Sequence, residues 1–179
     1  NGRELWKTDG TTNGTVLVKD LIPTGGSDPK QFTVMNGLVY FIAFNQDNGP
    51  AFARGREVYQ TDGTLSGTNQ STSIFSLGGS SPREIINHNG VLFISAHNGS
   101  HGYELWKSDG TEAGTVLVKD ITAGSGSTDI NLLTPVGRYV YFVTGNASRL
   151  WRSDGTEAGT VVVHDIVYFG YAFPLGSLT

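Results

Sequence analysis

The sequence predicts an all-β fold, because its glycine content, its turn residues and its apolar runs all indicate short strands joined by frequent turns. The 179 residues include 25 glycines but only 6 prolines, and Asp, Asn, Ser and Thr cluster with the glycines. Such a composition is typical of a chain that reverses direction often. Apolar runs such as LVYFIAF, VLFISA and YVYFVT lie between these clusters and have the length of strands. The length of the chain fits a single domain.

A repeated motif, D-G-T-x-x-G-T, organises the chain into units. Each copy follows an apolar or aromatic stretch such as RELWKT or YELWKS. The spacing from the motif aspartate to the glycine of the next hairpin is constant at 28 residues: Asp9 to Gly37, Asp62 to Gly90, Asp109 to Gly137. From that glycine to the following motif aspartate the spacing is 25, 19 and 17 residues. The variation in length therefore lies in one connection of the unit.

Each unit is expected to hold four strands, a to d. QFTVM and LVYFIAF form the first hairpin, because the intervening Asn36-Gly37 tolerates the positive φ angles of a type I′ turn. ELWKT and VLVKDL form the second hairpin, in which the Asp and Thr side chains of DGTTNGT can hydrogen-bond the backbone of the turn. In the second unit NQSTS replaces the apolar VLVKD, so an outermost strand is in doubt there.

Four strands in roughly 45 to 53 residues predict the blade of a β-propeller, with a β-solenoid as the alternative architecture. The expected units are a half blade at 1–22, blades at 29–75, 82–122 and 128–167, and the start of another blade at 168–179. Roughly three and a half blades are fewer than the four to eight that close a propeller. We therefore expect the chain to be part of a longer protein or to associate with copies of itself.

The signature ELWKSDGTEAGT resembles the ELWxxDGT repeat family of large secreted and surface proteins, chiefly bacterial, over essentially the whole chain. The resemblance implies an extracellular, β-propeller-like repeat region and brings no catalytic residues with it. The turn SDGTEAGT also resembles, more loosely, the Asp-box of sialidases, in which the aspartate braces a turn between the outer strands of a blade.

A residue type that recurs at the same place in every unit meets a need that every unit shares. The motif aspartates are therefore expected to brace turns, and the aromatic residues of strand c are expected to wedge between neighbouring blades. The turn aspartates are Asp9, Asp62, Asp109 and Asp154, and the aromatic residues are Trp6, Tyr59, Trp106 and Trp151.

Ligand binding is expected where the units differ, in the b-to-c and d-to-a connections, which share one rim of a propeller. The connection at 45–54 is the longest and is expected to shape this rim. The alternative is that the residues of these connections are ordinary solvated loop residues. In the repeat alignment Lys30, Arg83 and Ile130 are equivalent, as are Gln31, Glu84 and Asn131. The candidate ligand-binding residues are Lys30, Gln31, Asp47, Arg54, Arg83, Glu84, His97, His101 and Asn131.

No motif for catalysis or for a cofactor assembles. The chain has no cysteine, no P-loop and no G-x-S-x-G elbow, so we assign no catalytic residue and expect no cofactor. His97 and His101 share one loop, but a metal site needs a third ligand. Asp28, Asp47 and Asp129 could offer oxygen atoms to Ca²⁺, although no EF-hand-like pattern surrounds them.

Four N-x-S/T sequons are candidate N-glycosylation sites. They have a meaning only in a eukaryotic secretory route and are otherwise coincidental. The sequons are at Asn13, Asn69, Asn98 and Asn146.

Charge and hydropathy narrow the function. The net charge is -4 and no run of Lys or Arg exceeds two residues, which disfavours a nucleic-acid partner. No apolar stretch has the roughly 18 residues of a membrane helix. The sequence favours a non-enzymatic extracellular module, lectin-like, adhesive or scaffolding, that binds a glycan, a protein or another copy of itself. The alternative is a sialidase-like glycoside hydrolase with its site on the variable rim, but Ile130 and Asn131 replace Arg83 and Glu84 there, so no arginine cluster is expected.

Overall fold

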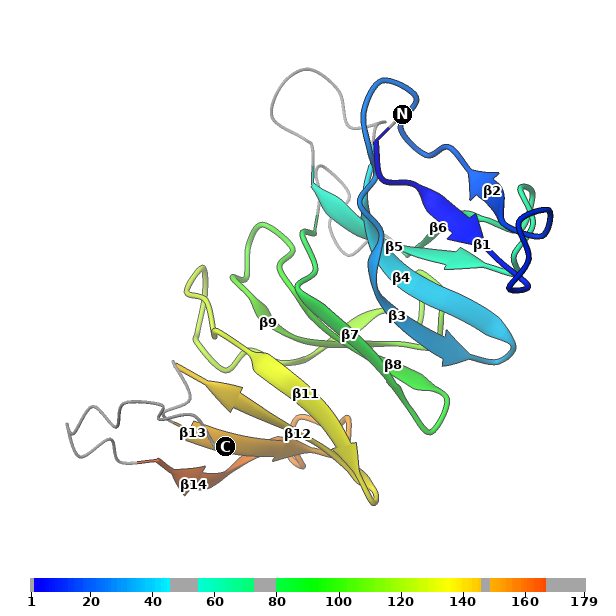
Figure 1. Cartoon of the computed structure of the whole chain (residues 1–179). Coiled ribbons are helices and arrows are strands. Elements are labelled where there is room, and N and C mark those ends of the chain that lie inside the picture. Colours follow the sequence, from blue (N-terminus) through cyan, green and yellow to red (C-terminus); the bar gives the residue numbers. More distant parts are fainter. Residues whose placement is uncertain (1, 46–54, 73–79, 146–148, 167–179) are drawn as a thin grey trace, which may run out of the picture.

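The structure, a computed structural model, describes residues 2–45, 55–72, 80–145 and 149–166, and within them it contains fourteen strands and no helix. The strands form one two-stranded and three four-stranded antiparallel sheets (Figure 1). Each sheet is a meander, because each strand pairs with the next one along the chain. The predicted all-β class and the predicted four-strand unit are thereby confirmed.

The strand bounds follow the repeat. The first sheet holds β1 (Leu5–Lys7) and β2 (Val16–Lys19). The second holds β3 (Lys30–Met35), β4 (Leu38–Phe44), β5 (Arg56–Thr61) and β6 (Asn69–Thr72). The third holds β7 (Glu84–His88), β8 (Val91–Ala96), β9 (Glu104–Ser108) and β10 (Val116–Lys119). The fourth holds β11 (Asn131–Val136), β12 (Tyr139–Thr144), β13 (Arg149–Ser153) and β14 (Val161–Asp165).

Two-residue turns join the first two strands of each four-stranded sheet. Asn36 and Gly37 have φ angles of 52° and 79°, and Asn89 and Gly90 have φ angles of 53° and 79°. Two consecutive positive φ angles are the mark of the predicted type I′ turn. In the fourth sheet Gly137 (φ 59°) takes the first turn position instead, which fits a type II′ turn with glycine first.

The outermost strand that NQSTS put in doubt does form. Strand β6 pairs with β5, with Gln70 opposite Tyr59 and Asn69 opposite Gln60. Polar side chains are compatible with a strand here because the ladder uses backbone groups, which every residue other than proline carries in full.

The first strands of the three four-stranded sheets do not all contain the same number of residues between matched pairs. This difference changes the alignment of the repeats. Lys30, Glu84 and Asn131 pair with the same position of the next strand, namely with Ile42, Ser95 and Val143. Bulges in β3 and β11 insert one residue that β7 lacks. The expected equivalences of Lys30 with Arg83 and Ile130, and of Gln31 with Glu84 and Asn131, are therefore wrong by one residue. Lys30 is equivalent to Glu84 and Asn131, and Gln31 lies in the bulge with a φ angle of 56°.

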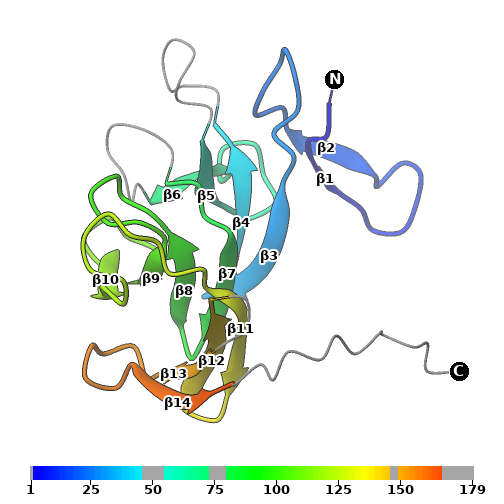
Figure 2. The same ribbon diagram turned by 90° about the vertical axis from the view of Figure 1, so that its left-hand side faces the viewer.

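Consecutive sheets lie next to one another through their first strands. Strand β3 lies beside β7, and β7 lies beside β11 (Figures 1 and 2). Asn87 links the first pair, because its amide donates to the Thr33 hydroxyl (3.0 Å) and its side chain donates to the Val34 carbonyl (2.7 Å). In the second pair Glu84 accepts hydrogen bonds from the amides of Leu132 (3.0 Å) and Leu133 (2.8 Å).

A hydrophobic cluster fills each junction between neighbouring sheets. Tyr59, Trp106 and Trp151 belong to the clusters at the first, second and third junction, and they are 6%, 6% and 8% exposed. These three aromatic residues act as the expected wedges. Trp6 differs, since it is 56% exposed and no further sheet covers it within the described part of the chain.

Lysine side chains also connect the sheets. Lys7 donates to the carbonyl of Gly63 (2.8 Å), and Lys107 donates to the carbonyl of Gly155 (2.8 Å). From the outermost strands, Lys19 donates to the Thr68 carbonyl (2.6 Å) and Lys119 to the Thr160 carbonyl (3.0 Å). Each lysine therefore ties one sheet to the D-G-T-x-x-G-T turn of the next sheet at the first and third junctions.

Candidate functional site

The D-G-T-x-x-G-T turns occupy one end of the sheets, and their internal hydrogen bonds are the same in all four copies. In the first copy Asp9 Oδ1 accepts hydrogen bonds from the Thr11 amide (2.9 Å) and the Thr11 hydroxyl (2.7 Å). The Thr11 hydroxyl accepts one from the Gly14 amide (2.9 Å), and the Thr15 hydroxyl donates to the Thr11 carbonyl (2.7 Å). Equivalent bonds form around Asp62, Asp109 and Asp154.

Both glycines of the motif are required by the geometry of the turn. Gly10 has a φ angle of 91°, which side chains disfavour. A Cβ at Gly14 would lie 1.9 Å from Asp9 Oδ1, so only glycine leaves room for the carboxylate. Gly110 has a further constraint, because a Cβ there would lie 2.5 Å from the Tyr40 hydroxyl of the preceding sheet.

The turn bonds also hold the pKa of all four motif aspartates below the usual range, first through the threonine hydroxyl and then through the threonine amide. Each carboxylate is thus stabilised in its ionised form by its own turn. The aspartates therefore brace the turns from within.

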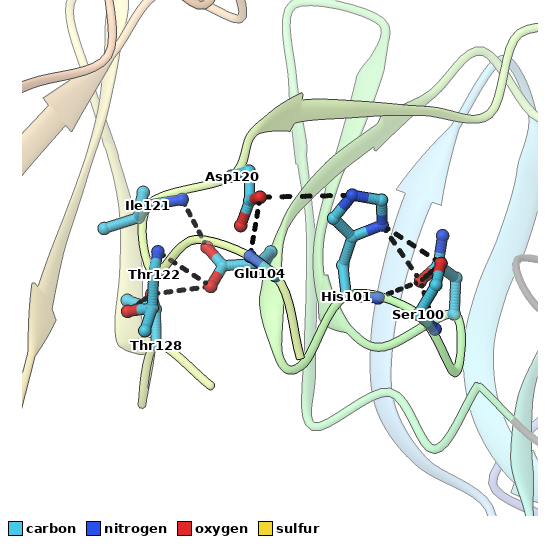
Figure 3. A network of polar contacts seen from close by, with 9 residues as sticks. Ser100, His101, Glu104, Asp120, Ile121, Thr122 and Thr128 are labelled. Carbon is cyan, nitrogen blue, oxygen red and sulfur yellow. Dashed lines mark hydrogen bonds and ion pairs between the residues drawn. The ribbon is translucent and has the colours of Figure 1, made fainter. Parts of the chain in front are cut away.

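At the other end, the start of strand c carries a buried glutamate that the sequence reasoning did not single out. Glu104 accepts hydrogen bonds from the amides of Ile121 (2.9 Å) and Thr122 (3.2 Å) and from the Thr128 hydroxyl (2.7 Å) (Figure 3). Glu57 accepts bonds from the Ser80 amide (2.8 Å) and hydroxyl (2.7 Å).

Glu4 makes the same type of contact in the first unit, with the Ser27 amide (2.9 Å) and hydroxyl (2.6 Å) and with the Leu21 amide (3.0 Å). All three glutamates are buried and hold the connection that leads to the next sheet. Their recurrence in RELW, REVY and YELW was the signal that could have identified them. Arg149 takes this place in the fourth unit and pairs with Asp165 (2.9 Å).

Burial raises the pKa of Glu57 to about 7, against the opposing effect of its hydrogen bonds from Ser80. Burial likewise raises the pKa of Glu104. Groups with raised pKa values can serve as catalytic acids, but Glu57 is 1% exposed and Glu104 is fully buried. Neither residue is accessible from the surface of the structure.

Arginines and aromatic rings lie above this layer, on the surface formed by the connections. Arg56 pairs with Asp28, which also pairs with Arg3 (3.4 Å), and these contacts hold the pKa of Asp28 below its usual range. The guanidinium of Arg56 lies 4.0 Å from the centre of the Phe44 ring. Two arginines thus share one carboxylate, so this group carries a net positive charge of one.

Arg83 and His97 both contact the Tyr103 ring, and Asp129 and Asn131 extend this contact. The guanidinium of Arg83 lies 3.6 Å from the Tyr103 ring centre and 2.9 Å from Asp129 Oδ1. The His97 ring packs edge-on against Tyr103 at 5.0 Å, and Asn131 donates to the Asp129 carbonyl (3.2 Å). We call these five residues, Arg83, His97, Tyr103, Asp129 and Asn131, the rim cluster.

The histidines have different surroundings. Burial, followed by the charge of Arg83, lowers the pKa of His97, so this ring is neutral at pH 7. His101 lies in a turn closed by Asn98, whose side-chain oxygen accepts a hydrogen bond from the His101 amide (2.7 Å), and its ring is 4.0 Å from Asp120 (Figure 3). The structure thus brings His97 into the rim cluster and leaves His101 beside it in the loop.

The remaining predicted ligand-binding residues do not join the rim cluster. Glu84 accepts hydrogen bonds from two backbone amides of β11 and therefore has a structural role. Lys30 and Gln31 are exposed on β3. Asp47 and Arg54, together with most of the 45–54 connection, lie outside the described residues.

The sequons and the candidate calcium ligands have the following positions. Asn13 and Asn69 are exposed, and Asn98 is half-buried and bonded to its own turn. Asn146 lies outside the described residues. Asp28 and Asp129 are separately paired with arginines, and within residues 2–45, 55–72, 80–145 and 149–166 no three His, Asp or Glu side chains gather into a group that could hold a metal.

A polar pocket of about 380 Å³ opens beside the rim cluster, between the β10–β11 connection and strands β12 and β13. Asp129 belongs to both features. The pocket is lined by Ile121, Thr122, Ser127, Thr128, Asp129, Thr144, Gly145, Arg149 and Trp151. A second pocket, of about 460 Å³, lies beside the exposed Trp6 and Phe32.

Comparison with protein-family models and with curated proteins gives no match for this chain. A search of the described residues for membrane spans finds no helix long and apolar enough to cross a bilayer.

Proposed function

We propose that the chain is a repeat module of an extracellular β-propeller, of the ELWxxDGT repeat type, and that it binds a glycan or a protein without catalysing a reaction. The observation that carries the proposal is the contrast between the two ends of the sheets. One end repeats the same turn four times, whereas the other end carries connections of unequal length, with the rim cluster and the polar pocket among them. Ligand sites on such folds are formed by variable loops held on a rigid scaffold.

The propeller arrangement is supported by the way the sheets meet. Strands β3, β7 and β11 lie side by side (Figure 2). The outermost strands β6, β10 and β14 lie at the opposite edge of each sheet. This is how the innermost strands of consecutive blades surround the channel of a propeller.

A binding role is favoured over glycoside hydrolysis by the state of the carboxyl groups. A glycosidase needs two carboxyl groups that flank the scissile bond. The carboxyl groups with raised pKa, Glu57 and Glu104, are buried under the connections, and the accessible Asp28 and Asp129 are each paired with an arginine. A paired, ionised aspartate is a poor proton donor.

Self-association or pairing with a further part of a longer protein belongs to the same proposal. Trp6 is 56% exposed and Phe32 is 54% exposed, although the counterparts of Trp6 are each covered by the preceding sheet. A further sheet of the same type would cover these rings. Light scattering on the 19.1 kDa chain tests self-association: dimers that Trp6→Ser disrupts support it, whereas a monomer at all concentrations leaves only the longer-chain form of the proposal.

The binding proposal is tested by screening the chain on a glycan array and against a panel of fluorogenic glycosides. Retention on glycans without turnover supports it, and turnover without retention would overturn it in favour of a hydrolase. Arg83→Ala removes the centre of the rim cluster and is expected to weaken retention. Arg138→Ala is the matched control, because Arg138 is an exposed arginine at the opposite end of the sheets, next to Gly137.

A further inference from the structure

The polar pocket lies at the third sheet junction, and the pairing of strands b and c shows how this junction differs from the first two. Ala43 pairs with Glu57, Ala96 with Glu104, and Thr144 with Arg149. The residue that follows strand position Ala43, Ala96 or Thr144 is therefore equivalent in the three units. Those residues are Phe44, His97 and Gly145.

At the first two junctions this position carries a ring. Phe44 packs beneath the Arg56 guanidinium at 4.0 Å, and His97 packs against Tyr103 at 5.0 Å. At the third junction Gly145 has no side chain, and a pocket of about 380 Å³ lies there. This volume is at the small end of the range for ligand pockets, which is roughly 300 to 1,000 Å³, and suits a ligand the size of one sugar ring.

The walls of the pocket combine hydroxyl groups with an apolar surface. The hydroxyls come from Thr122, Ser127, Thr128 and Thr144, and the apolar surface comes from Ile121 and Trp151. Thr128 already donates to Glu104 and is bonded to Thr122 (2.6 Å), and Ser127 accepts from the Tyr103 amide (3.1 Å). Because a hydroxyl can both donate and accept, each of these groups keeps a further donor or acceptor site, so the wall matches a ligand whose own polar groups are hydroxyls. The 8% of Trp151 that is exposed borders the pocket, and its Nε1 donates to the Thr144 hydroxyl (3.0 Å), which fixes the ring.

The charged residues of the pocket are balanced. Asp129 is 2.9 Å from Arg83, and Arg149 is 2.9 Å from Asp165. An anionic ligand would have to compete with Asp165 for Arg149, and a cationic ligand would have to compete with Arg83 for Asp129. The balance therefore favours a ligand without net charge.

We infer that this pocket binds one neutral pyranose residue of a glycan, with its hydroxyls on the threonine and serine wall and its C–H face toward Trp151 and Ile121. The inference rests on the proposed glycan-binding function and adds the place of the site and the class of the sugar. It also explains why one unit has glycine where its neighbours have rings.

The test is a titration followed by ¹H–¹⁵N NMR, with the indole N–H of Trp151 as the reporter and that of Trp106 as an internal reference. Trp106 is bonded to the Ala96 carbonyl (3.0 Å) away from the pocket. The probes are the methyl glycosides of glucose, galactose, mannose and N-acetylglucosamine, with glucuronic acid as the charged counterpart. We expect at least one neutral glycoside to shift Trp151 saturably, with millimolar affinity, and to leave Trp106 unchanged.

Two variants sharpen the test. Gly145→His restores the ring that the preceding unit carries, and histidine tolerates the φ angle of 58° at this position better than most residues. It is expected to weaken binding about tenfold or more. Gly99→His, at an exposed turn glycine with a φ angle of 86° outside the pocket, is the matched control and should leave binding unchanged.

The outcomes separate the pocket from the wider proposal. Glycan retention on the array with no shift at Trp151 would overturn the pocket and leave the proposed function in place. Unchanged binding by Gly145→His, or glucuronic acid binding as tightly as the neutral sugars, would also overturn the inference. If neither the array nor the titration detects a sugar, the pocket inference and the glycan form of the proposed function fail together.

Discussion

The turn aspartates and the buried glutamates are both carboxylates that hold backbone in place, but they do so over different distances. Asp9 bonds to Thr11, two residues away, and the other three motif aspartates do the same. Glu104 bonds to groups 17 to 24 residues away, in the connection to the next sheet. One carboxylate shapes a local turn and the other fixes the approach of two sheets.

The two sets also respond to pH with opposite signs. The pKa values of the aspartates are lowered, so their contribution to stability is present above the unfolded pKa and is lost as the pH falls through the folded value. The pKa values of Glu57 and Glu104 are raised, so their contribution is greatest below the unfolded pKa and is lost as the pH rises through the folded value. The turn aspartates at one end of the sheets therefore lose their stabilising contribution at low pH. The buried glutamates at the other end lose theirs at high pH.

The largest effect is expected from Glu104→Ala. The substitution leaves the Ile121 amide, the Thr122 amide and the Thr128 hydroxyl without their acceptor. Since each buried polar group that loses its partner costs about 1 to 3 kcal/mol, we expect the free energy of unfolding to fall by about 4 kcal/mol. The measurement is urea denaturation followed by tryptophan fluorescence.

Glu112→Ala is the control for this experiment. Glu112 is exposed in the third D-G-T-x-x-G-T turn and contributes only its backbone carbonyl, which accepts from the Thr115 amide (3.1 Å). A loss at Glu104 no larger than the loss at Glu112 would contradict the view that the buried glutamates fix the sheet junctions.

The next effect is a pH dependence that Glu57→Gln removes. Because burial raises the pKa of Glu57 from 4.5 to about 7, ionising this group disfavours the folded state. The wild-type stability is expected to decrease by on the order of 3 kcal/mol between about pH 4.5 and pH 8 through this residue. Denaturation midpoints of both proteins across this range give the slope, and Glu104 leaves a smaller slope of the same sign in the variant. An unchanged slope in Glu57→Gln would show that Glu57 ionises in the folded protein as freely as in the unfolded chain.

Local interactions explain which features the sequence could predict. The Asn36-Gly37 turn and the Asp9–Thr11 contacts are properties of a few adjacent residues, so the strands and turns were predictable from composition and motif. The contacts of Glu57 and Glu104 cross between sheets, and their partners Ser80 and Thr128 lie in connections of unlike sequence. The bulge at Gln31 was equally hidden, because one inserted residue leaves the hydrophobic pattern of β3 readable in either register.

The rim cluster shows the same division. Arg83, His97 and Asn131 were candidates because they lie in the variable connections. The structure brings Arg83 and His97 onto one ring, and Asn131 joins them only through the backbone of Asp129. Tyr103 and Asp129 were not expected as members. Tyr103 takes the place of Arg56 next to the buried glutamate of its unit, and only the packing of the third sheet reveals that Arg83 reaches its ring.

A smaller effect is expected from Asp154→Ala at the turn end. The variant loses the two bonds that Asp154 accepts from Thr156 (3.0 and 2.7 Å), and we expect a decrease of a few degrees in the melting temperature at pH 7. Asp154→Asn keeps an acceptor oxygen and should recover part of the loss. Since the contribution of an aspartate with a lowered pKa is lost in acid, the difference between wild type and Asp154→Ala should shrink toward pH 3. Unchanged melting combined with lost glycan retention would instead assign the motif to the ligand.

The smallest effect is expected from Lys107→Met, which tests whether the lysine contacts add to the junctions that the glutamates define. Methionine keeps most of the aliphatic stem but removes the bond from the lysine Nζ to the Gly155 carbonyl (2.8 Å), so we expect a loss of about 1 kcal/mol. Gln60 occupies the equivalent position of the second sheet, since it pairs with Tyr40 as Lys107 pairs with Phe93. Gln60→Met is therefore the matched control and should change the free energy of unfolding by less. If both substitutions cost the same, the bond from Lys107 to Gly155 adds nothing to the third junction beyond the packing of the lysine stem.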